Sequence, residues 1–350
     1  GSPNIAPEPS IMKVLQESIM VPENYKYAIN ELPEMKSAIH DWYKNRYNVE
    51  LTYDEMICLQ GSQEALSTLF LAMCDPGDIV LVPDPYYPIF SDGPKIAGAK
   101  VEYMPLLQEN NYVIQLDQID EEIAKKAKMM IVSYPNNPTC AIAPDSFYEE
   151  LIQFAKKYDI VVLHDNAYSE LVFDGKVGKS FLSFEGAKEI GIELNAFSKT
   201  YGMAGARLGV CVGNKEVIDC YNTLKSNMDY GIFLPIQYAG IEALRHGGAS
   251  IHSTCQAYQD RRDALCEAFD EVGWHINKSP ATMFAWARIP DQYEDSYAFT
   301  KDLMEKTGVV VTPGQAFGVH GTRCVRLALV QDIEDIQKAA ERIKKSEIFK

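Results

Sequence analysis

The sequence is poor in basic residues relative to acidic ones. Its 350 residues include 33 Lys and Arg against 49 Asp and Glu, which gives a net charge of −16. Blocks rich in Lys or Arg are absent, and a chain of this charge is repelled by nucleic acid and by anionic membranes. No apolar run reaches the roughly 20 residues that cross a bilayer. We therefore expect neither nucleic acid nor a membrane among the partners.

Cysteine occurs without the spacings that bind metal. Eight cysteines are spread along the chain, and neither a Cys-x-x-Cys nor a His-x-x-x-His pattern is found. Because metal sites draw on such closely spaced ligands, we predict no metal site. Scattered cysteines are typical of proteins in a reducing compartment, so the sequence favours a cytoplasmic protein.

The pattern of apolar residues divides the chain in two. From 56 to 213, strand-like runs alternate with amphipathic helices, which predicts parallel βαβ units in an α/β fold. After a long helical stretch at 253–272, strands and helices mix as in a small α+β domain. We predict a large domain at 21–252 and a discontinuous small domain at 1–20 and 253–350. The elements predicted after the long helix are strands at 283–289, 309–312 and 324–330 and a helix at 333–348.

Lys199 closely follows an apolar run at 190–197, and Arg207 lies eight residues beyond it. Most lysines are solvated surface charges, but ligands of open α/β sheets bind where strands end. Desolvation and cationic neighbours lower the pKa of a lysine, which can then attack a carbonyl. An arginine can hold a phosphate through two N–H groups. A lysine that forms an imine beside a phosphate-binding arginine suggests pyridoxal 5'-phosphate (PLP).

Four other apolar runs lead into residue types that PLP requires. Asp165 ends one run, and a carboxylate there would keep the pyridine nitrogen protonated. Asn137 follows a second run and could donate to the ring oxygen. Gly61 precedes a helical pattern whose first N–H groups could bind phosphate, and Tyr87 could stack on the ring. Each residue alone has an ordinary explanation as a turn, cap or packing residue. Their joint occurrence at strand ends favours a PLP site.

These motifs resemble those of the class I/II aminotransferases of PLP fold type I, over essentially the whole chain. The likeness is greatest to the subgroup that contains bacterial LL-diaminopimelate aminotransferases and their aspartate- and alanine-using relatives. The matching stretches are GDIVLVPDP (77–85), YPNNPT (134–139), HDNAY (164–168), SKTY (198–201), KSN (225–227) and GVVVTPG (308–314).

The resemblance implies a large domain with a mostly parallel sheet flanked by helices, and a smaller α+β domain. It implies PLP as the cofactor. It also implies that an amino group moves between an L-amino acid, such as LL-diaminopimelate or aspartate, and a 2-oxo acid, with 2-oxoglutarate as the expected acceptor.

The resemblance also implies roles for individual residues. Lys199 would attach the cofactor and carry the proton, and Asp165 would pair with the pyridine nitrogen. Arg326 would clamp the substrate α-carboxylate, with Gly1 and Asn137 beside it. The other residues implied in cofactor binding are Gly61, Ser62, Gln63, Ser198 and Arg207 at the phosphate, Asn137 and Tyr168 at the ring oxygen, and Tyr87 on the ring face.

The chain departs from the family at three of these motifs. Cys140 stands where glycine commonly follows Asn-Pro-Thr, and Ala206 stands where tryptophan commonly precedes the arginine. Ala196 replaces a frequent serine or threonine, so one phosphate contact is in doubt. These changes leave the lysine, aspartate and arginine chemistry in place, but they can reshape the pocket.

The resemblance further implies a homodimer with shared active sites. An early tyrosine of the family reaches the phosphate in the partner subunit, and here it is either Tyr25 or Tyr27, with Tyr27 preferred. The start at Gly1 resembles a segment that follows an N-terminal arm, so we expect the chain to begin inside the protein unless Gly1 and Ser2 are a cloning remnant.

Two other functions share most of these residues. A PLP-dependent C–S β-lyase differs in expelling a leaving group from the substrate. A non-enzymatic ligand sensor would need a basic DNA-binding module, for which 350 residues leave no room. The residues that read the distal end of the substrate are not determined, and Lys225, Asn227 and Tyr230 are candidates.

Overall fold

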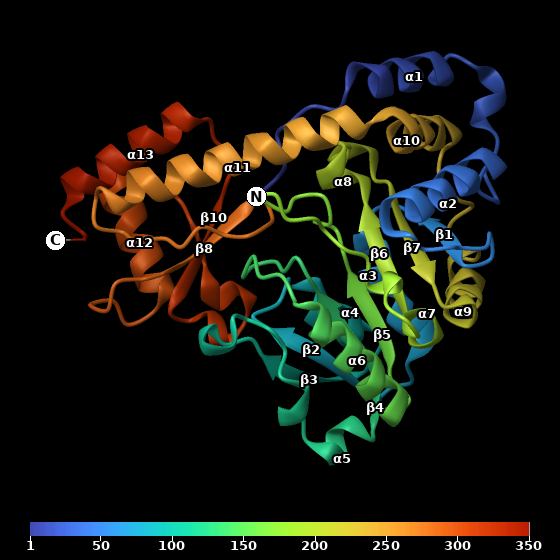
Figure 1. The fold of residues 1–350 in the computed structure, drawn as a ribbon, viewed down its shortest axis with the longest axis horizontal. Helices are drawn as coiled ribbons and strands as arrows, with labels where there is room; N and C mark the ends of the chain where they lie inside the picture. The colour runs from blue at the N-terminus through green and yellow to red at the C-terminus, as the bar shows by residue number, and fades with distance from the viewer. Residues whose placement is uncertain (350) are drawn as a thin grey trace.

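The computed structural model describes residues 1–349, which form two sheets with helices packed around them (Figure 1). The helices are α1 (Pro9–Ile19), α2 (Pro33–Tyr47), α3 (Ser62–Met73), α4 (Ile89–Ile96), α5 (Glu121–Ala124), α6 (Asp145–Tyr158), α7 (Ala187–Ile190), α8 (Phe197–Thr200), α9 (Lys215–Lys225), α10 (Leu234–His246), α11 (Gly248–Asp270), α12 (Ser296–Thr307) and α13 (Ile333–Ser346). Short 3-10 turns lie at Pro22–Tyr25, Gln108–Asn110, Leu116–Gln118, Phe181–Ser183, Ala204–Ala206, Gly314–Phe317 and Val319–Gly321.

The larger sheet has seven strands in the order β1-β7-β6-β5-β4-β2-β3. They are β1 (Met56–Leu59), β2 (Ile79–Asp84), β3 (Lys100–Pro105), β4 (Ala127–Ser133), β5 (Val161–Asp165), β6 (Gly191–Ala196) and β7 (Gly209–Gly213). In this sheet β7 runs against its neighbours, β1 and β6, and the other strands are parallel to one another. The prediction of a mostly parallel sheet flanked by helices is confirmed.

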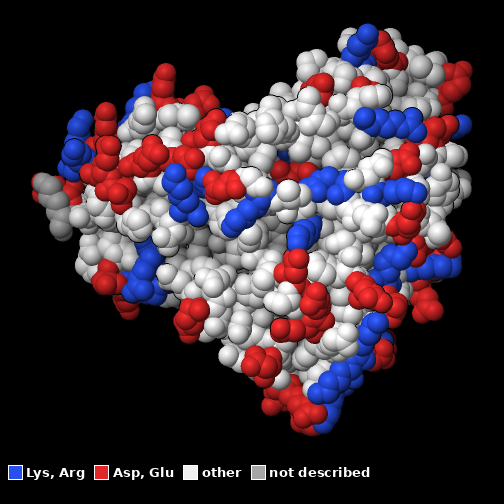
Figure 2. All heavy atoms as spheres, in the orientation of Figure 1, with Lys and Arg blue, Asp and Glu red and all other residues white. Residues whose placement is uncertain are grey.

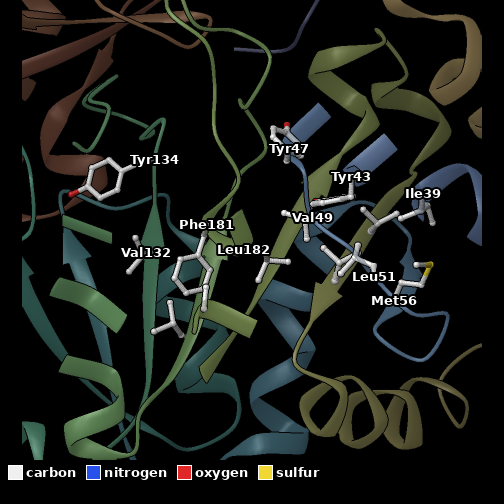
Figure 3. Packing of buried hydrophobic residues seen from close by; sticks show 14 of the residues in the cluster. Ile39, Tyr43, Tyr47, Val49, Leu51, Met56, Val132, Tyr134, Phe181 and Leu182 are labelled. Carbon is white, nitrogen blue, oxygen red and sulfur yellow. The ribbon is translucent and has the colours of Figure 1, made fainter. Parts of the chain in front are cut away.

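Alternation along the strands builds a core on each face of this sheet. On β4, Met130 and Val132 belong to the cluster of which Figure 3 shows a part, whereas Met129 and Ile131 belong to the cluster on the other face. Successive side chains of a strand point to opposite faces, so an unbroken apolar run such as this one needs cover on both. The helices supply that cover.

The smaller sheet is antiparallel, with β10 (Cys324–Ala328) between β8 (Phe284–Arg288) and β9 (Thr312–Pro313). The prediction of a strand at 309–312 is wrong for most of its length. Only Thr312 and Pro313 pair with β10, whereas Val309 donates its N–H to the Thr307 hydroxyl just after α12. In this stretch Val311 is buried but Val310 is 72% exposed, so the apolar run indicates neither ladder pairing nor full burial.

The two sheets are bridged by α11, a helix of 23 residues that crosses the top of the view in Figure 1 and packs on α13. The first helix, α1, packs on α10, and its buried Ile11 belongs to the core of the large sheet. The domain boundaries after residues 20 and 252 remain a proposal. The packing of α1 on α10 favours assigning this helix to the large domain. Within residues 1–349, no helix combines the length and the apolar character needed to cross a membrane.

Candidate active site

A cavity of about 570 Å³ opens where the parallel strands of the large sheet end. Strands β1, β2, β4, β5 and β6 all run in one direction, so the segments that follow them meet at one edge of the sheet. The small sheet closes the cavity from the other side through β8 and β10. The sequence-predicted residues that line it are Gly1, Ser62, Gln63, Tyr87, Asn137, Asp165, Tyr168, Ser198, Lys199, Arg207 and Arg326.

Arg207 lines the cavity and lies against Gly61, which does not itself line it. Gly61 precedes α3 with φ at +77°, and a Cβ on it would lie 2.4 Å from Arg207 Nη2, so glycine is required here. The guanidinium of Arg207 donates to the carbonyls of Ala204 (2.9 Å) and Gln60 (3.4 Å), and neither contact cancels its charge. A helix start with free N–H groups beside such a cation suits a phosphate.

Asp165 lies at the end of β5, buried, and its Oδ1 has no hydrogen-bond partner among residues 1–349. Burial raises the pKa of Asp165 to about 6, against the opposing effects of His164, the Ala167 N–H and Lys199. A buried carboxylate oxygen without a partner is costly, which means that this position suits a ligand that brings a proton donor. A protonated pyridine nitrogen is such a donor.

Lys199 lies on α8, directly after β6, and faces the same cavity. Desolvation lowers the pKa of Lys199 to about 8, with further lowering by Arg207 and Arg326, although Asp165 opposes it. A lysine in bulk water has a pKa near 10.4 and is almost wholly protonated at neutral pH. This amine is therefore far more available as a nucleophile and as a base than an ordinary lysine.

Arg326 reaches the cavity from β10, on the small sheet. Its guanidinium lies over the rings of Phe284 (4.1 Å) and Phe317 (4.5 Å), and its Nη1 donates to Asn137 Oδ1 (2.8 Å). Its Nε is buried without a hydrogen-bond partner in the described part of the chain, and burial lowers its pKa. A desolvated guanidinium with unused donors suits a carboxylate, which it can bind in a two-pronged way.

Two tyrosines complete the walls. Tyr87 donates its hydroxyl to Gln63 Oε1 (2.9 Å). Tyr168 is buried with its ring edge-on to Phe284, and burial raises the pKa of its hydroxyl, which stays protonated and available as a donor. Phe284 lines the cavity but was not predicted as a site residue, because its only sequence signal was membership of an apolar strand.

Several residues singled out in the sequence do not line this cavity. Tyr25 and Tyr27 are 65% and 76% exposed, and their rings pack edge-on against Phe233 and Tyr230. Lys225, Asn227 and Tyr230 do not line it either.

The departures from the family pattern have local explanations. Cys140 has φ at +63°, a conformation that favours glycine, and its buried Sγ contacts the Phe284 carbonyl (3.2 Å). Ala196 lines the cavity without a hydroxyl to offer. The alanine at 206 packs against the core of the large sheet.

The described residues fit PLP. The cavity offers the reactive amine of Lys199 and the partnerless carboxylate oxygen of Asp165. It also offers a helix start at Ser62 beside the uncompensated Arg207, and a second arginine, Arg326. A phosphorylated pyridine aldehyde has a matching group for each of the first three, and the second arginine is left for a substrate carboxylate.

Comparison with known proteins agrees with this geometry. The chain is 45% identical over 350 residues to the LL-diaminopimelate aminotransferase of Halothermothrix orenii, covering 99% of this chain and 90% of that one. It is 41% identical over 347 residues to the enzyme of the same name from Moorella thermoacetica, covering 99% and 89%. Among solved structures, substrate-bound BacF from Bacillus subtilis superimposes with a TM-score of 0.96 at 37% identity, covering 99% and 88%. A probable N-succinyldiaminopimelate aminotransferase from Thermus thermophilus gives 0.93 at 32%, covering 99% and 93%.

The family described as aminotransferase class I and II matches residues 3–343, almost the whole chain. Together with the relatives and the fold, this match shows that the chain belongs to the class I and II aminotransferases and is a PLP-dependent enzyme.

Proposed function

We propose that this aminotransferase takes the amino group of LL-diaminopimelate, or of a similar amino acid such as aspartate, and passes it to 2-oxoglutarate. The observation that carries this proposal is the cavity itself. It holds Arg207 and Arg326, neither paired with a carboxylate of residues 1–349, together with Lys199. Eight curated relatives that are 38–45% identical over at least 98% of the chain carry the name LL-diaminopimelate aminotransferase, which supports the choice of donor.

The roles of the residues follow from where their polar atoms lie. When bound, PLP supplies an electron-accepting ring. Asp165 would hold the proton on the ring nitrogen, and Tyr168 and Asn137 would donate to the ring oxygen. Phosphate would be bound by the N–H groups that follow Gly61, at Ser62 and Gln63, together with Ser198 and Arg207, while Tyr87 packs on the ring.

The substrate side would use Arg326 for the α-carboxylate, with Gly1 and Asn137 alongside. Lys199 would attach the cofactor and would then move a proton between the substrate Cα and C4' of the cofactor. Its lowered pKa allows this, because the amine must be neutral to accept that proton.

A panel of amino donors tests the substrate. Purified enzyme is expected to convert 2-oxoglutarate to glutamate with LL-diaminopimelate at a kcat/KM at least about tenfold above that of alanine, because a distal charged group adds binding energy that alanine lacks. Glutamate formation is measured for each donor. Pyruvate release from cystathionine or cysteine, without glutamate formation from any donor, would instead establish the C–S β-lyase.

We also propose that two copies of this chain assemble with shared active sites. Exposed apolar side chains gather on the segment after α1 and on the loop between α9 and α10, which pack on each other through the pairs Tyr25–Phe233 and Tyr27–Tyr230. A surface of this kind, left open in one chain, is typical of a protein–protein interface. Tyr27 is our choice for the contact with the partner's cofactor phosphate.

Mixing two inactive variants tests this assembly. Lys199→Ala and Tyr27→Ala chains, when mixed at random, are expected to regain up to about a quarter of wild-type activity, because half of the dimers are mixed and each has one intact site. The control mixes Lys199→Ala with Asp165→Asn. Both residues belong to one chain's site, so no activity should return. An active enzyme that sediments as a monomer would rule out shared sites, and a dimer without complementation would point to Tyr25 or to neither tyrosine.

We propose that the protein is cytoplasmic and that its ligands are small molecules, not nucleic acid. On the face shown in Figure 2, Lys and Arg side chains are interspersed with Asp and Glu. The net charge of −16 supports the same proposal, since polyanions are repelled by such a protein.

A further inference from the structure

Lys225 is a buried charge at the end of α9. Its side chain is 5% exposed, and its Nζ contacts Glu64 Oε1 (2.6 Å) and Asp229 Oδ2 (2.7 Å). Lysine is almost never buried unless it is paired, and here both contacts are ion pairs. The two carboxylates neutralise the ammonium, so it does not bind a substrate. The function of Lys225 therefore depends on the groups that these two carboxylates contact.

The first carboxylate holds the turn that leads to Gly61. Glu64 lies in the first turn of α3, and its second oxygen accepts the backbone N–H of Gln60 (2.5 Å). The side chain of Gln60 donates to Asp229 (3.3 Å), and its carbonyl accepts from Arg207 Nη2 (3.4 Å). Gln60 is thus held at three points, two of them on the carboxylates that pair with Lys225 and the third on Arg207.

The electrostatics of this cluster also bear on the phosphate site. An anion in the first turn of a helix competes with any phosphate that binds at the same helix start, because both are drawn to the same N–H groups and repel each other. Glu64 is such an anion. Burial opposes the charge of Lys225, but the hydrogen bonds that it donates to Asp229 and Glu64 outweigh this effect and raise the pKa of the lysine, which stays a cation. That cation offsets the charge of Glu64 close to the cofactor end of the cavity.

We propose that Lys225 is a positioning residue for the cofactor phosphate: through Glu64 it fixes Gln60 and the turn before α3, and its charge offsets that of Glu64. This inference rests on the proposed phosphate site at Ser62, Gln63 and Arg207. Lys225 touches neither the cofactor nor the substrate in this assignment.

The test compares two ligands that differ only by the phosphate. Dissociation constants of PLP and of pyridoxal are measured for the apoenzyme and for the variant Lys225→Met, which keeps an unbranched side chain one atom shorter and removes the charge. PLP binding is expected to weaken by about tenfold or more, since one lost charge-assisted contact at the turn is worth about that factor. Pyridoxal binding should change by less than about twofold. The ratio of the two constants isolates the phosphate from any general loss of structure.

Lys215 provides a matched control on the same helix. It too forms two ion pairs, with Asp54 (2.8 Å) and Asp219 (3.2 Å), but it is 52% exposed and lies at the other end of α9. Lys215→Met should leave both dissociation constants unchanged. Equal weakening of PLP and pyridoxal in Lys225→Met, or unchanged PLP binding in a folded variant, would overturn the proposal.

Two further variants keep the outcome decisive. If Lys225→Met does not fold, Lys225→Gln takes its place. The amide can still donate to one of the two carboxylates but carries no charge, and the same selective loss of PLP affinity is expected. Arg207→Gln reports on the phosphate site itself. A selective loss in Arg207→Gln but not in Lys225→Met or Lys225→Gln refutes only the positioning role, whereas no selective loss in any of the three refutes the phosphate site as well.

Discussion

Lys199→Ala is expected to lose amino transfer by a factor of at least about 10²–10⁴, the range that acid–base catalysis alone contributes. The alanine chain should still bind PLP, because Arg207, Asp165 and the start of α3 are untouched. It should lack the absorbance of the covalently attached cofactor. Turnover of the amino acid and the absorbance spectrum are measured on the same preparation.

The control is Lys179→Ala, which removes an exposed lysine that pairs with Asp145. It should turn over and absorb like wild type. Normal turnover in Lys199→Ala would show that another amine carries out the proton transfer. A variant that binds no PLP at all would show that the covalent bond, and not the phosphate contacts, supplies most of the affinity.

Asp165→Asn is expected to abolish amino transfer while weakening PLP binding much less. The amide keeps the shape of the side chain but carries no charge to hold a proton on the pyridine nitrogen, and without that proton the ring accepts electrons poorly. Single-turnover rates with the amino donor and equilibrium PLP binding measure the two effects separately. Equal rates for the variant and wild type would mean that another acid holds the proton.

The same substitution should stabilise the protein when no cofactor is bound. Burial raises the pKa of Asp165 from 3.8 to about 6, which corresponds to a cost of about 3 kcal/mol for the ionised group in the folded state. The sign follows from the two pKa values. The cost is fully present above pH 6, falls as the folded protein takes up a proton, and vanishes below the unfolded pKa of 3.8. Thermal unfolding of the apoprotein should therefore show Asp165→Asn as the more stable chain at about pH 8, with no difference near pH 4. Lower stability at the higher pH would mean that a partner of Asp165 offsets its burial.

The sequence could predict much of this site because its residues lie at or just after the ends of strands. The apolar runs before Gly61, Tyr87, Asn137, Asp165 and Lys199 are local signals. They form the strands β1, β2, β4, β5 and β6, in that order. Parallel strands bring their carboxyl ends to one edge of a sheet. Local pattern and elementary sheet geometry were therefore sufficient to place these residues together, although their roles stay proposals.

The pattern of apolar residues did not predict backbone conformation, strand pairing or the packing partner of a helix. The positive φ of Cys140 depends on how the turn after Asn137 packs, not on the residue itself. The run at 309–312 is mostly apolar, yet only its last residue pairs, since a strand needs a partner and the partner lies elsewhere in the chain. Likewise, the amphipathic α1 could have packed on either sheet, and its buried Ile11 joins the large one.

By itself, then, the sequence determined the alternation of elements, the mostly parallel sheet and the family, because these depend on local periodicity and on motifs a few residues long. Only the tertiary structure decided the partners of the charged residues. Arg326 contacts Asn137 across 189 positions and lies over Phe284, and Lys225 contacts Glu64 across 161. A buried charge takes whichever partner the packing brings within hydrogen-bond distance, and separation along the chain carries no information about that distance.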